Sequence, residues 1–431
     1  MADNLQPRPL RQNRTSHKRR AYTLSNEAHL RLESINEEGT CIAELLAVCQ
    51  AMGVVLPATL VDRFAELENQ RQELIMIPKL TRLPRSTRLH KHTSIAESMA
   101  ILRNQRHEFI GFFKFPPEQV TQLSQLIFPA GFSSPEHGLL ASEEAMLLLL
   151  AFYRNTHANI SALGHFLDRD RCNLSRHVAG MTQQLAERYG KLFDIRGLRR
   201  HARYVDANNR GLVPSWVAAI QSLHQAKFQT IAMHDYFNGV CLIMDGLRQD
   251  MCRCSFGELE SATYSGYTKT HCALWGVLLA PHGVVIALIG PFTGRHNDLV
   301  FCTPEVQAQV RAIEGKVLCD GIFHHRDWLV PLPSDADKEN MHMVSNQVSS
   351  MSAMRMPVEW TIGEAQASFP HAFVSRRNKI LQSDIAGKLR VSFLLNNLHT
   401  ILNGNNTSKY FGQHQPFSPE QYLHLLDGVE F

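Results

Sequence analysis

One stretch near the middle of the chain, residues 272–292, constrains the fold more than any other. It contains no Asp, Glu, Lys or Arg, and its only histidine is His282. Its length would suit a membrane-spanning helix, which needs about 20 apolar residues. However, Pro281, His282 and Gly283 stand at its centre and would break a helix. Two buried strands joined by a Pro-Gly turn explain the pattern better, so the sequence predicts a β-hairpin and no membrane span.

Other apolar runs place this hairpin in a larger mixed domain. The runs VCLIMDG (240–246) and VLCDG (317–321) have the length of strands, and the chain from Pro357 onward has helical periodicity. Strands that are followed by helices, with a hairpin among the early strands, are typical of a mixed α/β domain. We therefore expect an α/β domain over residues 206–431, in which Pro357 opens a helix.

The first half of the chain combines basic segments with helical ones. Residues 1–25 carry six Lys and Arg against one acid, which predicts a disordered basic arm. Such an arm serves nuclear import or contact with a DNA backbone, although a solvated tail has the same composition. Residues 26–105 predict a helical segment followed by a basic linker, and residues 106–205 predict an all-helical module.

Part of that module has the rhythm of a helix-turn-helix. We expect a short helix over 160–167, a turn at Asp168–Asp170, and a second helix that starts near Asn173. The start of the second helix is where such a motif contacts bases and phosphates. Many helical bundles contain a similar pair without binding DNA, so both interpretations stay open. The predicted DNA-binding residues are Arg169, Arg171, Asn173, Ser175 and Arg176, with His177 beside them.

Three acids stand where they could converge. Asp245 ends VCLIMD, Asp320 ends GKVLCD, and Glu359 lies about one turn into the predicted helix. Carboxylates that are held close together repel one another unless a cation lies between them. Mg²⁺ prefers carboxylate oxygens, and two such ions ~3.5–4 Å apart can drive an in-line displacement at phosphorus. An acid at a strand end is also a common turn residue, and Glu364 is a competing carboxylate on the helix.

These runs, taken in order, resemble the DDE superfamily endonuclease domain of PIF/Harbinger-type transposases. The helical module also looks like the region that precedes the nuclease in that family. The resemblance implies an RNase H-like fold for the α/β domain and a site for two Mg²⁺ or Mn²⁺ ions. The matching runs are NGVCLIMDG (238–246), TYSGYTKTHCALWGVLLAPHGVVIALIGPFTGRHND (263–298), VLCDG (317–321), MSAMRMPVEWTIGEAQASF (351–369) and LLNNLHTILNGNNTSKYFG (394–412).

The resemblance also assigns site residues. It implies that Asp245, Asp320 and Glu359 are the catalytic acids and metal ligands, and that Asp298 lies near the metal site as a further ligand or a supporting group. The chain departs from the family after Asp245, where Leu247 replaces a usual Thr, and after Asp320, where GIFHH follows. These departures keep a second interpretation open, in which a domesticated relative binds DNA or protein and is catalytically silent.

The function we predict is a metal-dependent DNA endonuclease of the transposase type, with strand transfer as a further step. DNA is the expected partner, and a homodimer is expected because two element ends must be cut. Relatives of this family act with a separate Myb-like protein, which a helix-turn-helix would make less necessary. The net charge of +4 is too small to argue for a polyanion, so affinity for DNA must come from local basic segments. Nine cysteines without a CxxC pair, and a polar start of the chain, predict an intracellular, nuclear protein.

Overall fold

The structure is a computed structural model of the chain. Two compact units make up the chain, Met1–His90 and Lys91–Phe431. Three predicted features lie outside the described residues: the basic arm, the helix over 160–167 and Arg169. The predicted domain boundary at 205 stays a prediction. The structure describes residues 63, 66, 106–134, 138–154, 170–206, 213–227, 237–253, 257–323, 326–334, 338–339, 345–374, 378–379 and 383–427.

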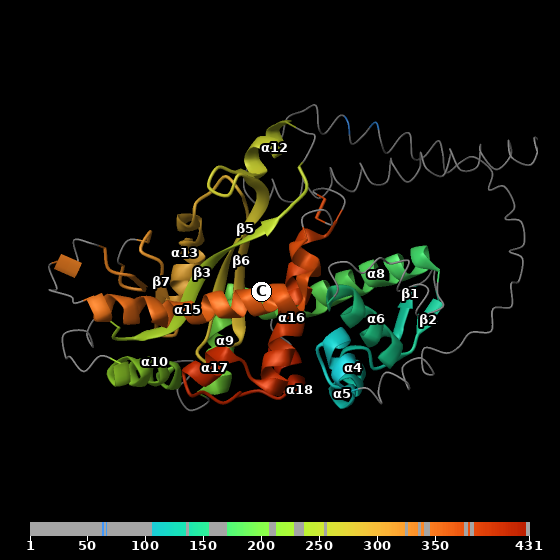
Figure 1. Cartoon of the computed structure of the whole chain (residues 1–431), viewed down its shortest axis with the longest axis horizontal. Coiled ribbons are helices and arrows are strands. Elements are labelled where there is room, and N and C mark those ends of the chain that lie inside the picture. The colour runs from blue at the N-terminus through green and yellow to red at the C-terminus, as the bar shows by residue number, and fades with distance from the viewer. Residues whose placement is uncertain are drawn as a thin grey trace, which may run out of the picture. The chain divides into compact units, whose positions relative to one another are not determined.

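A mixed six-stranded sheet lies at the centre of the second unit (Figure 1). The central strand β3 pairs antiparallel with β5 and parallel with β7. On the far sides, β6 pairs antiparallel with β5 and β8 pairs parallel with β7, while the short β4 joins the start of β5. The order is therefore β6–β5–β3–β7–β8, and β5 alone runs against the others. The strands are β3 (Val240–Asp250), β4 (Tyr264–Ser265), β5 (Thr270–Leu279), β6 (Val285–Thr293), β7 (Lys316–Cys319) and β8 (Leu329–Pro331).

The hairpin predicted over 272–292 is confirmed. β5 and β6 pair antiparallel from Ala273 opposite Thr293 to Leu279 opposite Val285. Gly283 closes the turn with a φ of +86°, which an L side chain rarely adopts, and its N–H donates to the carbonyl of Ala280 at 2.9 Å.

Among the described helices, none has both the length and the apolar character that crossing a lipid bilayer requires.

The two faces of the sheet enter two hydrophobic cores. Because successive side chains of a strand point to opposite faces, β3 divides its apolar residues between them. Ile243 and Leu247 join the core that contains α6, α8, α15 and α16, whereas Leu242 and Met244 join the core that contains α9 and α13. The helices are α4 (Arg106–Phe113), α5 (Pro117–Ile127), α6 (Ser142–Arg154), α8 (Arg171–Tyr189), α9 (Leu198–Val205), α10 (Pro214–Lys227), α12 (Gly257–Thr263), α13 (Pro304–Ala312), α15 (Ser345–Ser368), α16 (Ile385–Asn403), α17 (Asn406–Tyr410) and α18 (Pro419–Leu423).

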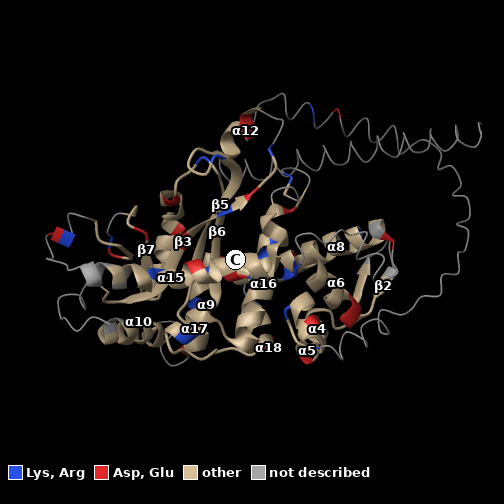
Figure 2. Cartoon of the chain, in the orientation of Figure 1, with Lys and Arg blue, Asp and Glu red and all other residues tan. Residues whose placement is uncertain are grey.

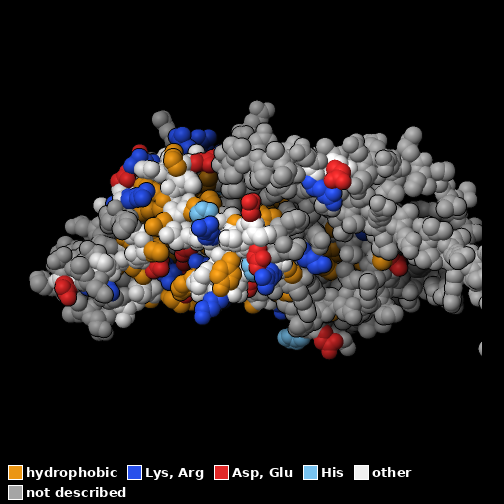
Figure 3. Space-filling view, turned by 90° about the horizontal axis from the view of Figure 1, so that it is seen from above, with side chains coloured by type: hydrophobic (Ala, Val, Ile, Leu, Met, Phe, Trp, Pro, Cys, Tyr) orange, Lys and Arg blue, Asp and Glu red, His pale blue; other side chains and the backbone are white. Residues whose placement is uncertain are grey.

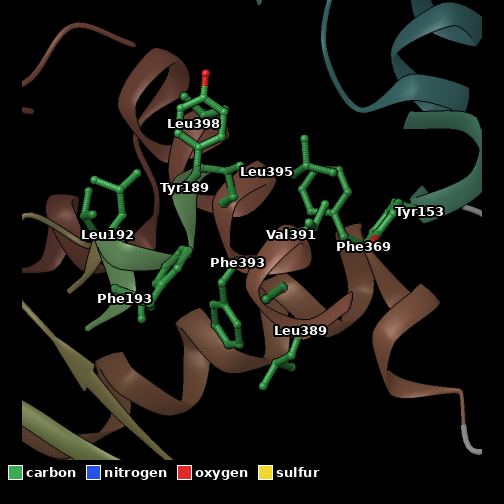
Figure 4. Packing of buried hydrophobic residues seen from close by; sticks show 14 of the residues in the cluster. Tyr153, Tyr189, Leu192, Phe193, Phe369, Leu389, Val391, Phe393, Leu395 and Leu398 are labelled. Carbon is green, nitrogen blue, oxygen red and sulfur yellow. The ribbon is translucent and has the colours of Figure 1, made fainter. Parts of the chain in front are cut away.

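The helix α16 connects the helical layer with the sheet. Its Phe393, Leu395 and Leu398 are buried beside Tyr189 at the end of α8 and Phe193 in the turn that follows (Figure 4). The same core also contains Val285 and Leu288 of β6. The helical layer and the sheet therefore share one apolar interior, and either part would expose buried side chains without the other.

The helix that carries Glu359 differs from its prediction. It begins at Ser345 and not at Pro357, so that Pro357 lies inside it. A proline inside a helix has no N–H for the carbonyl four residues earlier, here that of Ala353. The hydroxyl of Tyr410, at the end of α17, donates to this carbonyl at 3.3 Å. A contact from 57 residues away thus compensates for the hydrogen bond that the proline removes.

Candidate active site

Asp245 and Asp320 stand at the end of the pairing between β3 and β7. Ile243 and Leu318 are the last registered partners of this parallel pair, and each of the two acids follows two residues later. Asp320 comes directly after β7, as predicted. Asp245 does not end its strand, because β3 continues to Asp250 along β5. At Asp245, β3 is still paired with β5 on one side, whereas its pairing with β7 on the other side has already ended.

Glu359 reaches the same place from α15, but through an arginine that the sequence analysis did not single out. Arg355 lies one helical turn before Glu359, and its guanidinium contacts both carboxylates. Nη1 forms an ion pair with Oδ2 of Asp245 at 2.9 Å, and Nη2 donates to Oε1 of Glu359. The side chains of Arg355 and Asp245 are 17% and 20% exposed, while that of Glu359 is 35% exposed. A single cationic group therefore lies between the first and the third predicted acid.

The electrostatic field of this cluster includes Asp320 as well. Burial raises the pKa of Asp245, and the neighbouring Arg355 opposes that rise. Burial lowers the pKa of Arg355, but Asp245, Glu359 and Asp320 outweigh it, and the pKa of the guanidinium ends above its ordinary value. Asp320 itself is exposed, and its backbone neighbour Gly321 donates an N–H to Oδ1 at 2.8 Å. Three carboxylates thus act on one guanidinium.

Asp298 lies beside the cluster, on the other face of β3. A Cβ atom placed on Gly246 would meet Oδ2 of Asp298 at 2.9 Å, so the carboxylate occupies the space where a side chain would begin. Because Gly246 follows Asp245 in the strand, this is the face opposite to the Asp245 side chain. Nη2 of Arg248 stands 3.7 Å from Oδ1 of Asp298, which has no hydrogen-bond partner among the described residues. Burial raises the pKa of Asp298, Arg248 opposes that rise, and Asp320 adds to it.

The competing helix carboxylate, Glu364, belongs to a different environment. Its Oε1 stands 3.7 Å from Nδ1 of His399 on α16. Burial raises the pKa of Glu364, and the charges of Lys114 and Lys409 oppose that rise. The structure therefore brings Glu359, and not Glu364, into contact with the arginine that binds Asp245.

The donor set of this cluster suits a hard divalent cation. Carboxylate oxygens are the ligands that Mg²⁺ and Mn²⁺ accept, and the unpartnered Oδ1 of Asp298 is a further buried acceptor. In the part of the chain that the structure describes, no three His, Cys, Asp or Glu side chains are spaced to hold a metal ion. Arg355 contacts the carboxylates of Asp245 and Glu359 through two separate nitrogens. We call Asp245, Asp298, Asp320, Glu359, Arg248 and Arg355 together the acidic site.

The predicted DNA-binding residues lie at the start of α8, far from the acidic site in sequence. The carboxylate of Asp170 caps this helix by accepting from the N–H groups of Cys172 at 2.9 Å and Asn173 at 3.2 Å. Ser175 and Arg176 are exposed and Asn173 is half-buried, while the Arg171 side chain lies outside the described set. His177 is 3% exposed and packs edge-on against the ring of Phe132, so it faces the core and not the exposed side of this helix.

Charge is spread over the described surface without a dominant sign. Figure 2 shows acidic and basic stretches close together along α15, in front of the strands. On the face that Figure 3 shows, acidic and basic side chains of the described residues mix with hydrophobic ones. This distribution agrees with the small net charge of +4.

The chain was compared with protein families, with curated proteins and with solved structures, and one family model matches. A search of curated proteins found no match, and neither did a search of solved structures. The family model described as DDE superfamily endonuclease matches residues 244–395, which run from β3 to α16 and include Asp245, Asp298, Asp320 and Glu359. At this level the match indicates a transposase-like nuclease domain. The segment that builds the acidic site is therefore similar to the DDE superfamily endonucleases.

Proposed function

We propose that this protein is a metal-dependent DNA endonuclease of the PIF/Harbinger transposase type. Asp245, Asp320 and Glu359 are its catalytic acids and hold two Mg²⁺ or Mn²⁺ ions. The observation that carries the proposal is that Asp245 of β3 and Glu359 of α15 both contact the guanidinium of Arg355, while Asp320 at the end of β7 adds to the negative field around it. Arg355 brings one positive charge to three carboxylates from separate elements of the matched segment, and the remaining negative charge is what a divalent cation would neutralise.

The topology of the sheet supports an RNase H-like fold. Three antiparallel strands in chain order, β3, β5 and β6, are followed by two parallel strands, β7 and β8, on the other side of β3. In this arrangement the central strand carries the first acid and its parallel neighbour carries the second. The helix α15 then crosses one face with the third acid.

The mechanism assigns each part of the chain a task. Bound divalent ions supply the chemistry, since they activate the attacking water or DNA 3′-OH and stabilise the leaving oxygen. Asp245 is fixed by a strand that is paired on both sides up to that point, so its carboxylate offers a rigid reference position. Asp320 and Glu359 are more exposed and lie on the side from which a DNA strand can approach. Asp298, which lies against Gly246, supports the site from behind.

DNA binding is proposed for the start of α8 and for the basic arm at residues 1–25. Arg169, Arg171, Asn173, Ser175 and Arg176 would supply contacts to phosphates and bases, with affinity that falls as salt rises. We further propose that the protein acts in the nucleus as a homodimer, so that two DNA ends are cut together, with a Myb-like protein as an additional partner.

The experiment that tests the function is cleavage of supercoiled plasmid DNA by the purified full-length chain. Reactions contain Mg²⁺, Mn²⁺ or EDTA, and wild type is compared with a Glu359→Gln variant. We expect nicking that requires a divalent ion and that falls by at least about a thousandfold in the variant, about 4 kcal/mol of activation free energy. DNA binding that is unchanged in the variant, without nicking by wild type under any condition, would refute the nuclease.

A matched control is available on the same helix. Glu364→Gln removes a carboxylate from α15 only five residues later, in the separate environment near His399. We expect it to retain cleavage, which would show that the loss in Glu359→Gln is specific to the acidic site.

A further inference from the structure

We propose that Arg355 is an internal counter-ion that holds the acidic site together in the absence of metal and is displaced when a divalent cation binds. The inference rests on the proposed function, and it names a positioning residue that regulates the same site. It predicts that wild type binds metal more weakly than the carboxylates alone would allow.

The contacts of Arg355 carry the first step of the argument. Its Nη1 and Nη2 each contact a different carboxylate, that of Asp245 and that of Glu359, in place of a two-pronged contact with one partner. The guanidinium therefore lies between the two acids, where a cation shared by both would have to be. Without it, two carboxylates of the same sign would lie close together in a site that is only partly solvated.

The second step concerns how firmly Arg355 is held. Its Nε atom is buried and has no hydrogen-bond partner among the described residues. Its side chain is 17% exposed, and the groups that raise its pKa are Asp245, Glu359 and Asp320. A guanidinium that is locked into a fold donates from all sides to fixed carbonyls. Arg154 provides the contrast, because it donates to the carbonyls of Gly111 and Ala367 at 3.3 and 2.7 Å. Among the described residues, the polar contacts of Arg355 are those with the carboxylates of Asp245 and Glu359.

The third step is the exchange itself. A divalent cation brings two charges to the same carboxylates, and it requires their oxygens to point at a common centre. Arg355 contacts these carboxylates through two different nitrogens, so both contacts must break before the metal binds. Its long side chain can then turn toward solvent, where it remains beside the acidic site. The cost of breaking the two contacts lowers the apparent affinity for metal.

The test measures metal binding directly, and cleavage is a separate readout. Mn²⁺ is titrated into the full-length wild type and into an Arg355→Met variant, with calorimetry in a buffer that contains no DNA. We expect Mn²⁺ to bind the variant at least about tenfold more tightly. Arg355→Lys keeps a positive charge that cannot bridge two carboxylates in the same way, so its affinity should lie in between. Arg311→Met is the control, because it breaks an arginine–aspartate pair with Asp327, away from the acidic site.

Each outcome decides the proposal. Tighter Mn²⁺ binding in Arg355→Met, with intermediate binding in Arg355→Lys, would support the proposal. This holds even if wild type does not cut DNA, because a failure to cut would count against the nuclease alone. Equal or weaker binding in both variants, with thermal unfolding in EDTA showing that they are folded, would overturn it even if wild type cuts DNA. No binding of Mn²⁺ to any of the proteins would overturn both the counter-ion and the nuclease.

Discussion

The turn between β5 and β6 and the acidic site both place polar side chains against the same sheet, but they satisfy these groups differently. At the turn, Asn397 of α16 is fully buried and uses its whole amide. Oδ1 accepts from the N–H of Val285 at 3.0 Å, and Nδ2 donates to the carbonyl of Val285 and to the hydroxyl of Tyr422, both at 2.8 Å. Asn405 and Gln415 donate to the carbonyls of Gly283 and His282. We call these residues, with His282, the turn network.

The acidic site contains charges where the turn network contains amides. Its groups are partly exposed, and Asp298 Oδ1, Arg248 Nε and Arg355 Nε are buried without hydrogen-bond partners among the described residues. A neutral network with its hydrogen bonds made stabilises a fold, whereas unpaired buried groups cost free energy. The turn network also leaves two buried atoms, His282 Nε2 and Gln415 Oε1, without hydrogen-bond partners among the described residues, so the two regions differ chiefly in charge. Because a buried charge costs more free energy than a buried amide, the acidic site gives up more stability than the turn network.

The largest effect we expect is a loss of DNA cleavage, without a comparable loss of stability, when the acidic site is changed. Asp245→Asn replaces one ligand oxygen by an amide and should lower DNA cleavage by at least about a thousandfold, about 4 kcal/mol. The free energy of unfolding should change by less than about 1 kcal/mol, because the carboxylate is already disfavoured by burial. Plasmid nicking and urea unfolding measure the two effects. A large loss of stability would break the comparison.

The second effect we expect is a loss of stability when the turn network is changed. Asn397→Leu keeps the size of the side chain but leaves the N–H and carbonyl of Val285 without partners. We expect the free energy of unfolding to fall by roughly 3 kcal/mol, since each buried unpaired group costs about 1–3 kcal/mol. Asn403→Ala is the control on the same helix, because Asn403 is exposed and should change stability by less than about 1 kcal/mol. Equal effects of the two variants in urea unfolding would contradict the prediction.

The third effect is a pH dependence that belongs to the turn network. Burial, with His201 nearby, lowers the pKa of His282 to about 3. Below its ordinary value of 6.5 the unfolded chain therefore binds a proton that the folded chain does not, and stability falls as the pH falls. The slope from this residue is about 1.4 kcal/mol per pH unit. In His282→Gln, unfolding curves between pH 6 and 4 should show a slope that is smaller by this amount, and an unchanged slope would argue against it.

The smallest effect we expect is on the free energy of unfolding, from a variant outside both regions that serves as a reference for the other variants. Arg311 and Asp327 form an exposed ion pair, in which Nη2 and Oδ2 are 2.6 Å apart. Arg311→Met should change the free energy of unfolding by less than about 1 kcal/mol, because exposed pairs contribute little. A larger change in thermal unfolding would show that surface charge matters more in this chain than the comparison assumes.

What the sequence could predict was local. The hairpin followed from apolar runs on both sides of Pro281 and Gly283, and Asp320 followed directly after a short strand. Asp245 was placed at the end of its strand because the polar residues after it do not look buried. Their pairing with Cys272–Gly276 depends on another strand, which no local pattern reveals.

The arginine at the centre of the acidic site was missed for a similar reason. Its spacing of four residues before Glu359 was visible and is a common helical ion pair. Its second contact, with Asp245, joins segments more than a hundred residues apart, so the pair alone gave no sign of a role in the site. The start of α15 was misplaced because Pro357 suits the first turn of a helix, whereas here a distant tyrosine makes it acceptable inside one.

That tyrosine has a consequence for genetics. Tyr410 donates to the one carbonyl of α15 that Pro357 leaves open, two residues before Arg355. A premature stop codon or frameshift between Glu359 and Tyr410 would leave every acid of the site encoded, yet the helix that carries Arg355 and Glu359 would lose its support. Nonsense alleles late in the gene should therefore behave like null alleles and not like mild truncations.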